Sequence, residues 1–242
     1  MTSSTLTRQG PLSGTTVKKY LRTLGHVFSV AVRKWKLIES NPVQHVEMPK
    51  EPKGRVRFLS EAEMQKLLAA CRESCCAMLY LAVLLSLATG MRLGELRSLT
   101  WDRVDLERGH VILEITKNKD TRGVPVTGES LARLRQLARG RRLDTKFVFP
   151  SQDGRRGFDF RASFTRALKV AEITDFHWHD LRHTCASYLV MSGAALNSVA
   201  ALLGHRTLAM TKRYSHLSDE FLRTEVEKMT SRLFTTSERK QS

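Results

Sequence analysis

Three short polar motifs near the C-terminal end of the chain hold histidines, arginines and a tyrosine in a fixed order. His179 and Arg182 lie three residues apart in the first motif. His205 follows a leucine–glycine step in the second, and Tyr214 closes the third, while Arg92 lies far upstream. A tyrosine hydroxyl is a nucleophile, and fixed cations stabilise the negative charge that gathers on a phosphodiester under attack. These residue types therefore indicate cleavage of a nucleic-acid strand through a covalent intermediate.

The spacing of these residues suggests a separate role for each. Side chains three residues apart face the same side of a helix, so one turn presents His179 and Arg182 together. A guanidinium donates two parallel hydrogen bonds to phosphate oxygens, which an ammonium cannot do, and Arg92 supplies a second such group. We expect His205 to donate to a non-bridging oxygen and His179 to accept the proton of Tyr214.

The chain has more than one tyrosine that could be the nucleophile. Tyr214 lies on a polar segment directly after Lys212 and Arg213, whose positive charges are expected to lower its pKa. The others fall within apolar helical patterns and are predicted to be core residues: Tyr20, Tyr80 and Tyr188.

Several residues beside the motifs are predicted to have supporting or structural roles. Glu95 follows Arg92 by three residues and is expected to orient the arginines through hydrogen bonds. His183 and His216 are predicted to be structural, and Trp178 to pack under the helix of the first motif. The histidine spacing at 177, 179 and 183 is compatible with a metal, but no carboxylate or cysteine cluster completes a site. Neither a metal nor another cofactor is therefore expected.

The chain is strongly basic, with 242 residues and a formal net charge of +16. Residues 1–57 alone hold 11 Lys and Arg against 3 Asp and Glu, a net charge of +8. Such a charge favours a polyanionic partner, most often nucleic acid, although a solubilising surface or a disordered basic arm has the same composition. We expect these residues of the N-terminal helix to bind DNA: Lys18, Lys19, Arg22, Arg33, Lys34 and Lys36.

The hydrophobic periodicity predicts a mainly α protein with a small antiparallel β-sheet, an α+β fold. A helix is expected from Thr15, and a second from the capping box formed by Ser60 and Glu63. The apolar run from Cys75 to Gly90 predicts a third. Two strands are predicted over 110–115 and 123–126, joined by a polar hairpin tip. Further helices are expected over 92–99, 129–139, 158–172, 180–192, 195–203, 207–214 and 218–231.

The apolar run over 75–91 is followed at once by Arg92 and Glu95, so a buried core helix is expected rather than a membrane span. The four cysteines form no even framework, and no secretory signal is recognised at the N-terminus. These features predict reduced thiols in a cytoplasmic protein with no membrane partner.

In order and spacing, the motifs resemble those of the tyrosine recombinases of the phage-integrase family, over about residues 15–235. The resemblance implies part of a helical core-binding, DNA-clamping domain over 1–46, a linker over 47–57 and a catalytic domain over 58–242. In the family the clamping domain is a larger helical bundle. The implied catalytic set is Arg92, Lys117, His179, Arg182, His205 and Tyr214. Lys117 on the hairpin tip would protonate the leaving 5′-oxygen, and Lys119 on the same tip is the alternative.

The resemblance implies a site-specific DNA recombinase or integrase that cleaves and rejoins double-stranded DNA through a 3′-phosphotyrosine intermediate. It further implies a homotetramer on the DNA, in which a C-terminal segment, here 218–234, docks onto a neighbouring subunit. The protein would be associated with DNA in the cytoplasm. Two other functions are open to such a chain: a non-catalytic DNA-binding regulator that keeps the fold, and a tyrosine-type topoisomerase.

Overall fold

The computed structural model describes residues 12–49, 56–114 and 121–234. The chain divides into two compact units, with the division between Arg55 and Val56. The first unit contains α1 (Gly14–Val30), which continues as a π-helix over Ala31–Trp35, and a short 3-10 helix over Pro42–His45. Ser13 caps α1 by accepting a hydrogen bond from the amide of Thr16.

The interior of the first unit is small and consists of contacts between one side of α1 and the segment around Asn41 and Val43. The amide nitrogen of Asn41 donates to the carbonyl of Gly25 at 2.8 Å and to Ser29 Oγ at 3.0 Å. Val43 is buried beside this contact. One short helix covers only one side of α1, so Tyr20 is 57% exposed. The prediction that Tyr20 is a core residue is therefore wrong.

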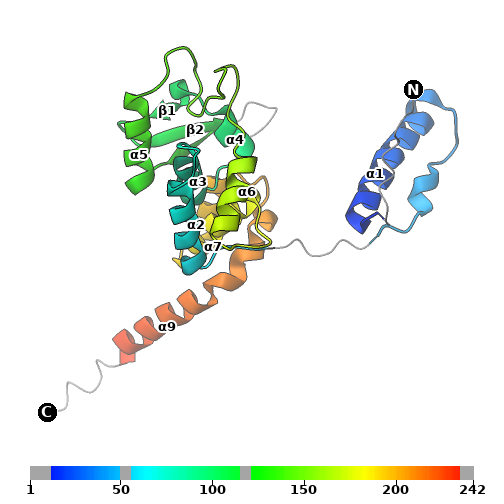
Figure 1. Ribbon diagram of the computed structural model, residues 1–242. Helices are drawn as coiled ribbons and strands as arrows, with labels where there is room; N and C mark the ends of the chain where they lie inside the picture. Colours follow the sequence, from blue (N-terminus) through cyan, green and yellow to red (C-terminus); the bar gives the residue numbers. More distant parts are fainter. Residues whose placement is uncertain (1–11, 50–55, 115–120, 235–242) are drawn as a thin grey trace. The chain divides into compact units, whose positions relative to one another are not determined.

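The second unit is mostly helical, with a three-stranded sheet at one end (Figure 1). In chain order its elements are α2 (Glu61–Arg72), α3 (Leu79–Thr89), α4 (Leu93–Ser98), a 3-10 helix (Trp101–Arg103), β1 (Val104–Asp105), β2 (His110–Glu114), β3 (Thr121–Pro125), α5 (Gly128–Arg139), α6 (Arg161–Val170), α7 (Trp178–Met191), α8 (Leu196–Leu203), two 3-10 helices (Leu208–Met210 and Lys212–Ser218) and α9 (Asp219–Phe234). The predicted α+β class is confirmed.

The sheet is antiparallel, in the order β1-β2-β3. Val111 pairs with Val124 and Leu113 with Arg122, and all four side chains are buried. The sequence predicts only two strands, because β1 has two residues and is too short to show an alternation. Thr121 and Arg122 were expected in the polar hairpin tip, but they belong to β3.

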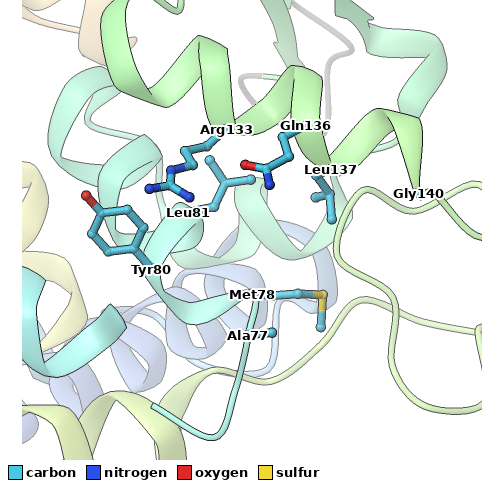
Figure 2. A pocket seen from close by; sticks show the side chains of 8 residues that line it. All are labelled: Ala77, Met78, Tyr80, Leu81, Arg133, Gln136, Leu137 and Gly140. Atoms are coloured by element: carbon cyan, nitrogen blue, oxygen red, sulfur yellow. The ribbon is translucent and has the colours of Figure 1, made fainter. Parts of the chain in front are cut away.

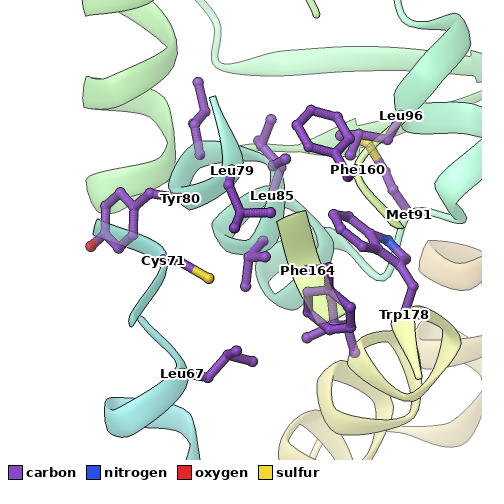
Figure 3. Close-up of a cluster of buried hydrophobic side chains, with 14 of the residues drawn as sticks. Leu67, Cys71, Leu79, Tyr80, Leu85, Met91, Leu96, Phe160, Phe164 and Trp178 are labelled. Atoms are coloured by element: carbon purple, nitrogen blue, oxygen red, sulfur yellow. The ribbon is translucent and has the colours of Figure 1, made fainter. Parts of the chain in front are cut away.

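The main core of the second unit lies between α2, α3, α6 and the start of α7. Trp178, the first residue of α7, packs on Phe160 and Phe164 with ring centroids 5.6 and 4.8 Å away (Figure 3). The predicted packing of Trp178 is thus confirmed. Helix α3 is apolar on nearly every side and correspondingly buried. It begins at Leu79 rather than at Cys75, whose side chain is exposed.

None of the helices within the described ranges is long and apolar enough to cross a membrane. All four cysteines are free thiols. Burial raises the pKa of Cys71 and of Cys185 to about 12, which keeps both thiols protonated.

Candidate active site

Helix α7 is the element around which the predicted site residues gather. It carries His179 and Arg182, and it packs against α3, α8 and the 3-10 helix Lys212–Ser218. Arg92 lies just after α3, His205 just after α8, and Tyr214 within that 3-10 helix. Packing on one central helix therefore brings together residues that are far apart in the sequence.

Two glycines end the helices that meet α7. Gly90 ends α3 and Gly204 ends α8, and both adopt left-handed backbone angles, with φ of +64° and +65°. A Cβ on Gly90 would lie 2.2 Å from Leu203, so glycine is also needed there for close approach. These turns explain the leucine–glycine step before His205 and the Thr89–Gly90 step before Arg92, because each turn places the residue that follows it at the site.

Arg182 links both turns. Its guanidinium donates to the carbonyl of Gly90 at 2.8 Å and to the carbonyl of Leu203 at 2.5 Å, and the side chain is buried. A guanidinium carries more N–H donors than these two carbonyls use. Burial, and then the charge of Arg92, lower the pKa of Arg182 to about 10. The group stays charged at neutral pH, and its surroundings favour the arrival of an anion.

Glu95 holds two arginines in place. One carboxylate oxygen accepts from Arg92 Nη1 at 2.8 Å, and the other accepts from the Arg92 backbone amide at 2.8 Å. Arg122 makes a bidentate pair with the same carboxylate at 3.0 and 2.9 Å and donates through Nε to the carbonyl of Leu202. Burial alone would raise the pKa of Glu95, but the hydrogen bonds from Arg122 and Arg92 outweigh it and lower the pKa.

Sequence reasoning missed Arg122. The sequence predicts it in the polar hairpin tip, whereas the residue is only 7% exposed. The signal was the strand period: Arg122 lies two residues before Val124, on the same face of β3. A charged residue on a buried face predicts a buried partner, which is Glu95 here.

Replacing Arg122 by methionine is expected to lower the free energy of unfolding by about 3–5 kcal/mol, because the carboxylate of Glu95 loses its bidentate partner in a buried place. Urea titration of the whole chain measures this. Arg97→Met removes a partly exposed ion pair with Asp159 and should change stability by less than about 1 kcal/mol. An equal decrease in the free energy of unfolding in the two variants would show that the Arg122–Glu95 pair stabilises the fold no more than the partly exposed pair does.

Tyr214 is buried, with 2% of its surface exposed. Its hydroxyl oxygen lies 2.5 Å from Nδ1 of His183. Burial raises the pKa of Tyr214, and the charges of Arg213 and Arg182 oppose this only in part. The prediction of a lowered pKa is therefore wrong, because desolvation of the phenolate outweighs the neighbouring cations.

The structure places His183, rather than His179, against the hydroxyl of Tyr214. His183 is 8% exposed, and burial followed by the charge on His179 lowers its pKa to about 4. It is therefore a neutral imidazole at neutral pH and can accept a hydrogen bond. His179 lies one helical turn earlier, with its ring 5.1 Å from that of His183, and is exposed. Partial burial, then Arg182 and Arg92, lower the pKa of His179.

His205 has one ring nitrogen engaged by a buried threonine. Its Nδ1 lies 2.7 Å from Oγ1 of Thr211, which is completely buried. Burial and then Arg182 and Arg92 lower the pKa of His205 to about 4. In the tautomer in which Thr211 donates, Nε2 carries the hydrogen and can donate to a phosphate oxygen.

A cavity of about 490 Å³ opens beside Arg92 and Glu95. Gly204, Arg206 and Glu114, at the end of β2, also line it. Lys117 and its alternative Lys119 lie outside the described residues. The strands that flank them are β2, which ends at this cavity, and β3, which carries Arg122.

The other predicted residues fall elsewhere. The basic residues proposed to bind DNA lie on α1, on the π-helix of the first unit and, for Lys36, directly after it. Lys18 is half-buried and the rest are exposed. Across the described ranges, no group of three or more His, Cys, Asp or Glu side chains could hold a metal. A separate cavity of about 330 Å³ lies between α3 and α5 beside Tyr80 and Arg133 (Figure 2). It contains none of the predicted site residues.

The histidines predict how stability depends on pH. The folded pKa of His183 and of His205 is about 4, below the usual 6.5. Between these values the unfolded chain binds a proton that the folded protein does not, so stability falls as the pH drops from 6.5 to 4. From pH 7 to pH 5, each histidine should contribute a loss of roughly 1–2 kcal/mol, allowing for solvent around His205.

Urea titrations at both pH values check this expectation. His205→Asn should show a smaller loss between pH 7 and pH 5 than the wild type. His110→Asn, on the exposed side of β2, controls for the exchange itself. An unchanged loss in His205→Asn would contradict the expected contribution of that histidine.

Comparison with known proteins agrees with the fold and identifies the family. Residues 57–220 match the Phage integrase family, and the chain belongs to this family. It is 35% identical over 213 residues to a shufflon-specific DNA recombinase of Escherichia coli, which covers 86% of the chain and 52% of that protein. It is 34% identical to the tyrosine recombinase XerC of Bacillus subtilis, over 88% of the chain and 73% of that protein.

Solved structures give the same fold. The catalytic domain of bacteriophage HP1 integrase is 32% identical, with a TM-score of 0.57 over 72% of the chain and 95% of that domain. The Tn1549 transposon integrase, solved in complex with a circular intermediate DNA, has a TM-score of 0.72 over 90% of the chain and 80% of that structure. At 22% identity this likeness concerns the fold alone. The chain spans 52% and 60% of two of its relatives, the shufflon recombinase and the integrase of Salmonella phage P22.

Proposed function

We propose that the chain is a site-specific DNA recombinase that cleaves and rejoins DNA strands through a 3′-phosphotyrosine on Tyr214. Membership of the phage integrase family supports this proposal. The observation that carries it is the buried cation of Arg182, placed by α7 among Arg92, His205 and Tyr214. A charged guanidinium with a lowered pKa, beside a second arginine that lines a cavity, suits a phosphodiester that becomes more negative during attack.

The proposed reaction proceeds in two transesterifications. The oxygen of Tyr214 attacks the scissile phosphorus, and the bond from phosphorus to the 5′-oxygen breaks. Lys117, with Lys119 as the alternative, is proposed to protonate that leaving oxygen. A 5′-hydroxyl from a second duplex then attacks the phosphotyrosine and releases Tyr214. The bond energy is kept in the ester, so the proposal needs no cofactor and no nucleotide.

Trapping the covalent intermediate tests this function. A nicked duplex lets the short strand with the free 5′-hydroxyl diffuse away, so the protein stays attached to the labelled strand. A slow band on a denaturing gel is the expected result. Binding without any such band would favour a non-catalytic DNA-binding regulator. An adduct with plasmid relaxation but no exchange between paired sites would favour a topoisomerase.

We further propose that the protein assembles as a homotetramer on DNA through α9. This helix follows directly from the 3-10 helix of Tyr214 and packs chiefly on it. The ring of Phe221 contacts Gly193 of the same chain. The remaining large apolar side chains of α9 are more than half exposed: Leu222, Val226, Met229, Leu233 and Phe234. An apolar row of this kind fits docking onto a second copy.

DNA binding is expected to weaken steeply with salt. Each neutralised phosphate contributes about −0.9 to the slope of log K against log salt concentration, so six basic residues on the first unit would give a slope of about −5. Fluorescence anisotropy with a labelled duplex measures the slope. Lys34→Gln should make it less negative by about one. A slope near zero would contradict the proposal that these basic residues neutralise DNA phosphates.

A further inference from the structure

We propose that His183 takes the proton of Tyr214 as the tyrosine oxygen attacks phosphorus. This inference rests on the proposed function. Its basis is a single close contact between two buried side chains: Nδ1 of His183 lies 2.5 Å from the hydroxyl oxygen of Tyr214. Among the residues that the structure describes, His183 is the hydrogen-bond partner of this hydroxyl.

The position of His183 follows from the helix. It lies four residues after His179 and one after Arg182 on α7, and its ring faces the 3-10 helix that carries Tyr214. A hydroxyl can donate only to an atom with a free lone pair, and the neutral imidazole of His183 offers one at Nδ1 in the tautomer that carries its hydrogen on Nε2. The exposed ring of His179 contacts His183 edge to face, and it remains available for phosphate.

In the proposed step the proton of Tyr214 passes to His183 during cleavage and returns during rejoining. The Tyr214 oxygen forms a bond to phosphorus while its hydrogen moves to Nδ1 of His183, which becomes an imidazolium. The phosphorus–oxygen bond to the 5′-carbon side breaks, and that oxygen receives a proton from the general acid. When a 5′-hydroxyl later attacks the phosphotyrosine, its proton passes to the deprotonated general acid, and the imidazolium of His183 returns its proton to the leaving oxygen of Tyr214.

Charges around His183 explain how the base becomes competent when DNA binds. Asp180 on the same helix favours its protonated form, whereas His179, Arg213 and Arg182 oppose it. A phosphodiester held by Arg182 would bring negative charge next to these cations and cancel part of their effect. Substrate binding therefore raises the proton affinity of His183 at the point where the proton must move.

A different role for the same contact predicts the opposite result. If His183 only keeps Tyr214 buried until DNA arrives, then removing the hydrogen bond frees the nucleophile and cleavage becomes faster. If His183 is the base, removing it slows cleavage. The sign of the rate change therefore separates the two roles.

The experiment measures single-turnover adduct formation from pH 5 to pH 9 on a duplex whose scissile 5′-oxygen is replaced by sulfur. A thiolate leaves without a general acid, so only activation of the nucleophile is observed. His183→Asn keeps an acceptor near the place of Nδ1 but cannot take a proton. We expect it to lose about 10²–10³-fold in rate near neutral pH and to gain rate with rising pH where the wild type is level.

His179→Asn is the matched control, with the same exchange one helical turn away. It is expected to lose rate but to keep the wild-type pH profile. The inference is overturned if His183→Asn reacts as fast as the wild type or faster, or if its pH profile is unchanged. In that case an adduct formed by the wild-type protein still upholds the proposed function. A wild-type protein that forms no adduct on any duplex overturns both.

A measurement on the protein without DNA tests the contact directly, so that the inference does not depend on whether His183→Asn folds. Nitrogen NMR of the whole chain should show Nδ1 of His183 unprotonated and accepting a hydrogen bond, and Tyr214→Phe should shift that signal. A protonated Nδ1, or a signal that ignores Tyr214→Phe, overturns the inference.

Discussion

Tyr214→Phe is expected to abolish formation of the covalent adduct while DNA binding stays at the wild-type level. The exchange removes the phenolic oxygen and nothing else, so no other group at that position can attack phosphorus. The fold should survive. The lost hydrogen bond to His183 should lower the free energy of unfolding by about 1 kcal/mol, because the pair is buried. Denaturing gels with a nicked, labelled duplex measure the adduct, and gel shifts measure binding.

Tyr188→Phe is the matched control for this prediction. It removes one phenolic oxygen from the same helix bundle, where the hydroxyl donates to the carbonyl of Leu59 at 3.2 Å. This variant should still form the adduct. Peptide mapping of the wild-type adduct should place the DNA on the fragment over 210–216. An adduct that persists in Tyr214→Phe, or that maps to another tyrosine, would falsify the proposed mechanism.

Arg182→Lys is expected to reduce the rate of adduct formation by about 10²–10³-fold, which corresponds to roughly 3–4 kcal/mol of transition-state stabilisation. Lysine keeps the positive charge but cannot hold the carbonyls of Gly90 and Leu203 and also grip phosphate with a planar fork. DNA binding should change little, because the interaction grows mainly as charge develops in the transition state. Alanine is a poorer probe here, since it would leave both buried carbonyls without their donor.

Arg92→Ala provides the comparison at the second cation. Its side chain is 36% exposed, so truncation should cost little stability while cleavage is still lost. Thermal melting of both variants separates a folding defect from a chemical one. Near-normal cleavage by a well-folded Arg182→Lys protein would remove Arg182 from the site, and the same result for Arg92→Ala would remove Arg92.

Local patterns were sufficient to predict most of the elements of the second unit. The capping box of Ser60 and Glu63 forms as predicted, and the apolar run ending at Gly90 forms a buried helix. These features depend on residues within one or two turns of each other. The short strand β1 and the late start of α3 were not predicted. The pairing of β1 with β2 and the turn before Leu79 depend on contacts in the folded chain, and the periodicity of hydrophobic residues does not show them.

For the candidate site too, some features could be predicted from local sequence and others could not. The sequence by itself determined which residue types are present and their order, because the His-x-x-Arg step and the two glycine turns are local features. Only the tertiary structure decided which histidine meets Tyr214, that Arg122 pairs with Glu95, and that the pKa of Tyr214 is raised. Those outcomes depend on burial and on which helices pack on α7. The charge and hydrogen-bonding state of a side chain follow from the groups that surround it in space, and its neighbours in the sequence do not fix those groups.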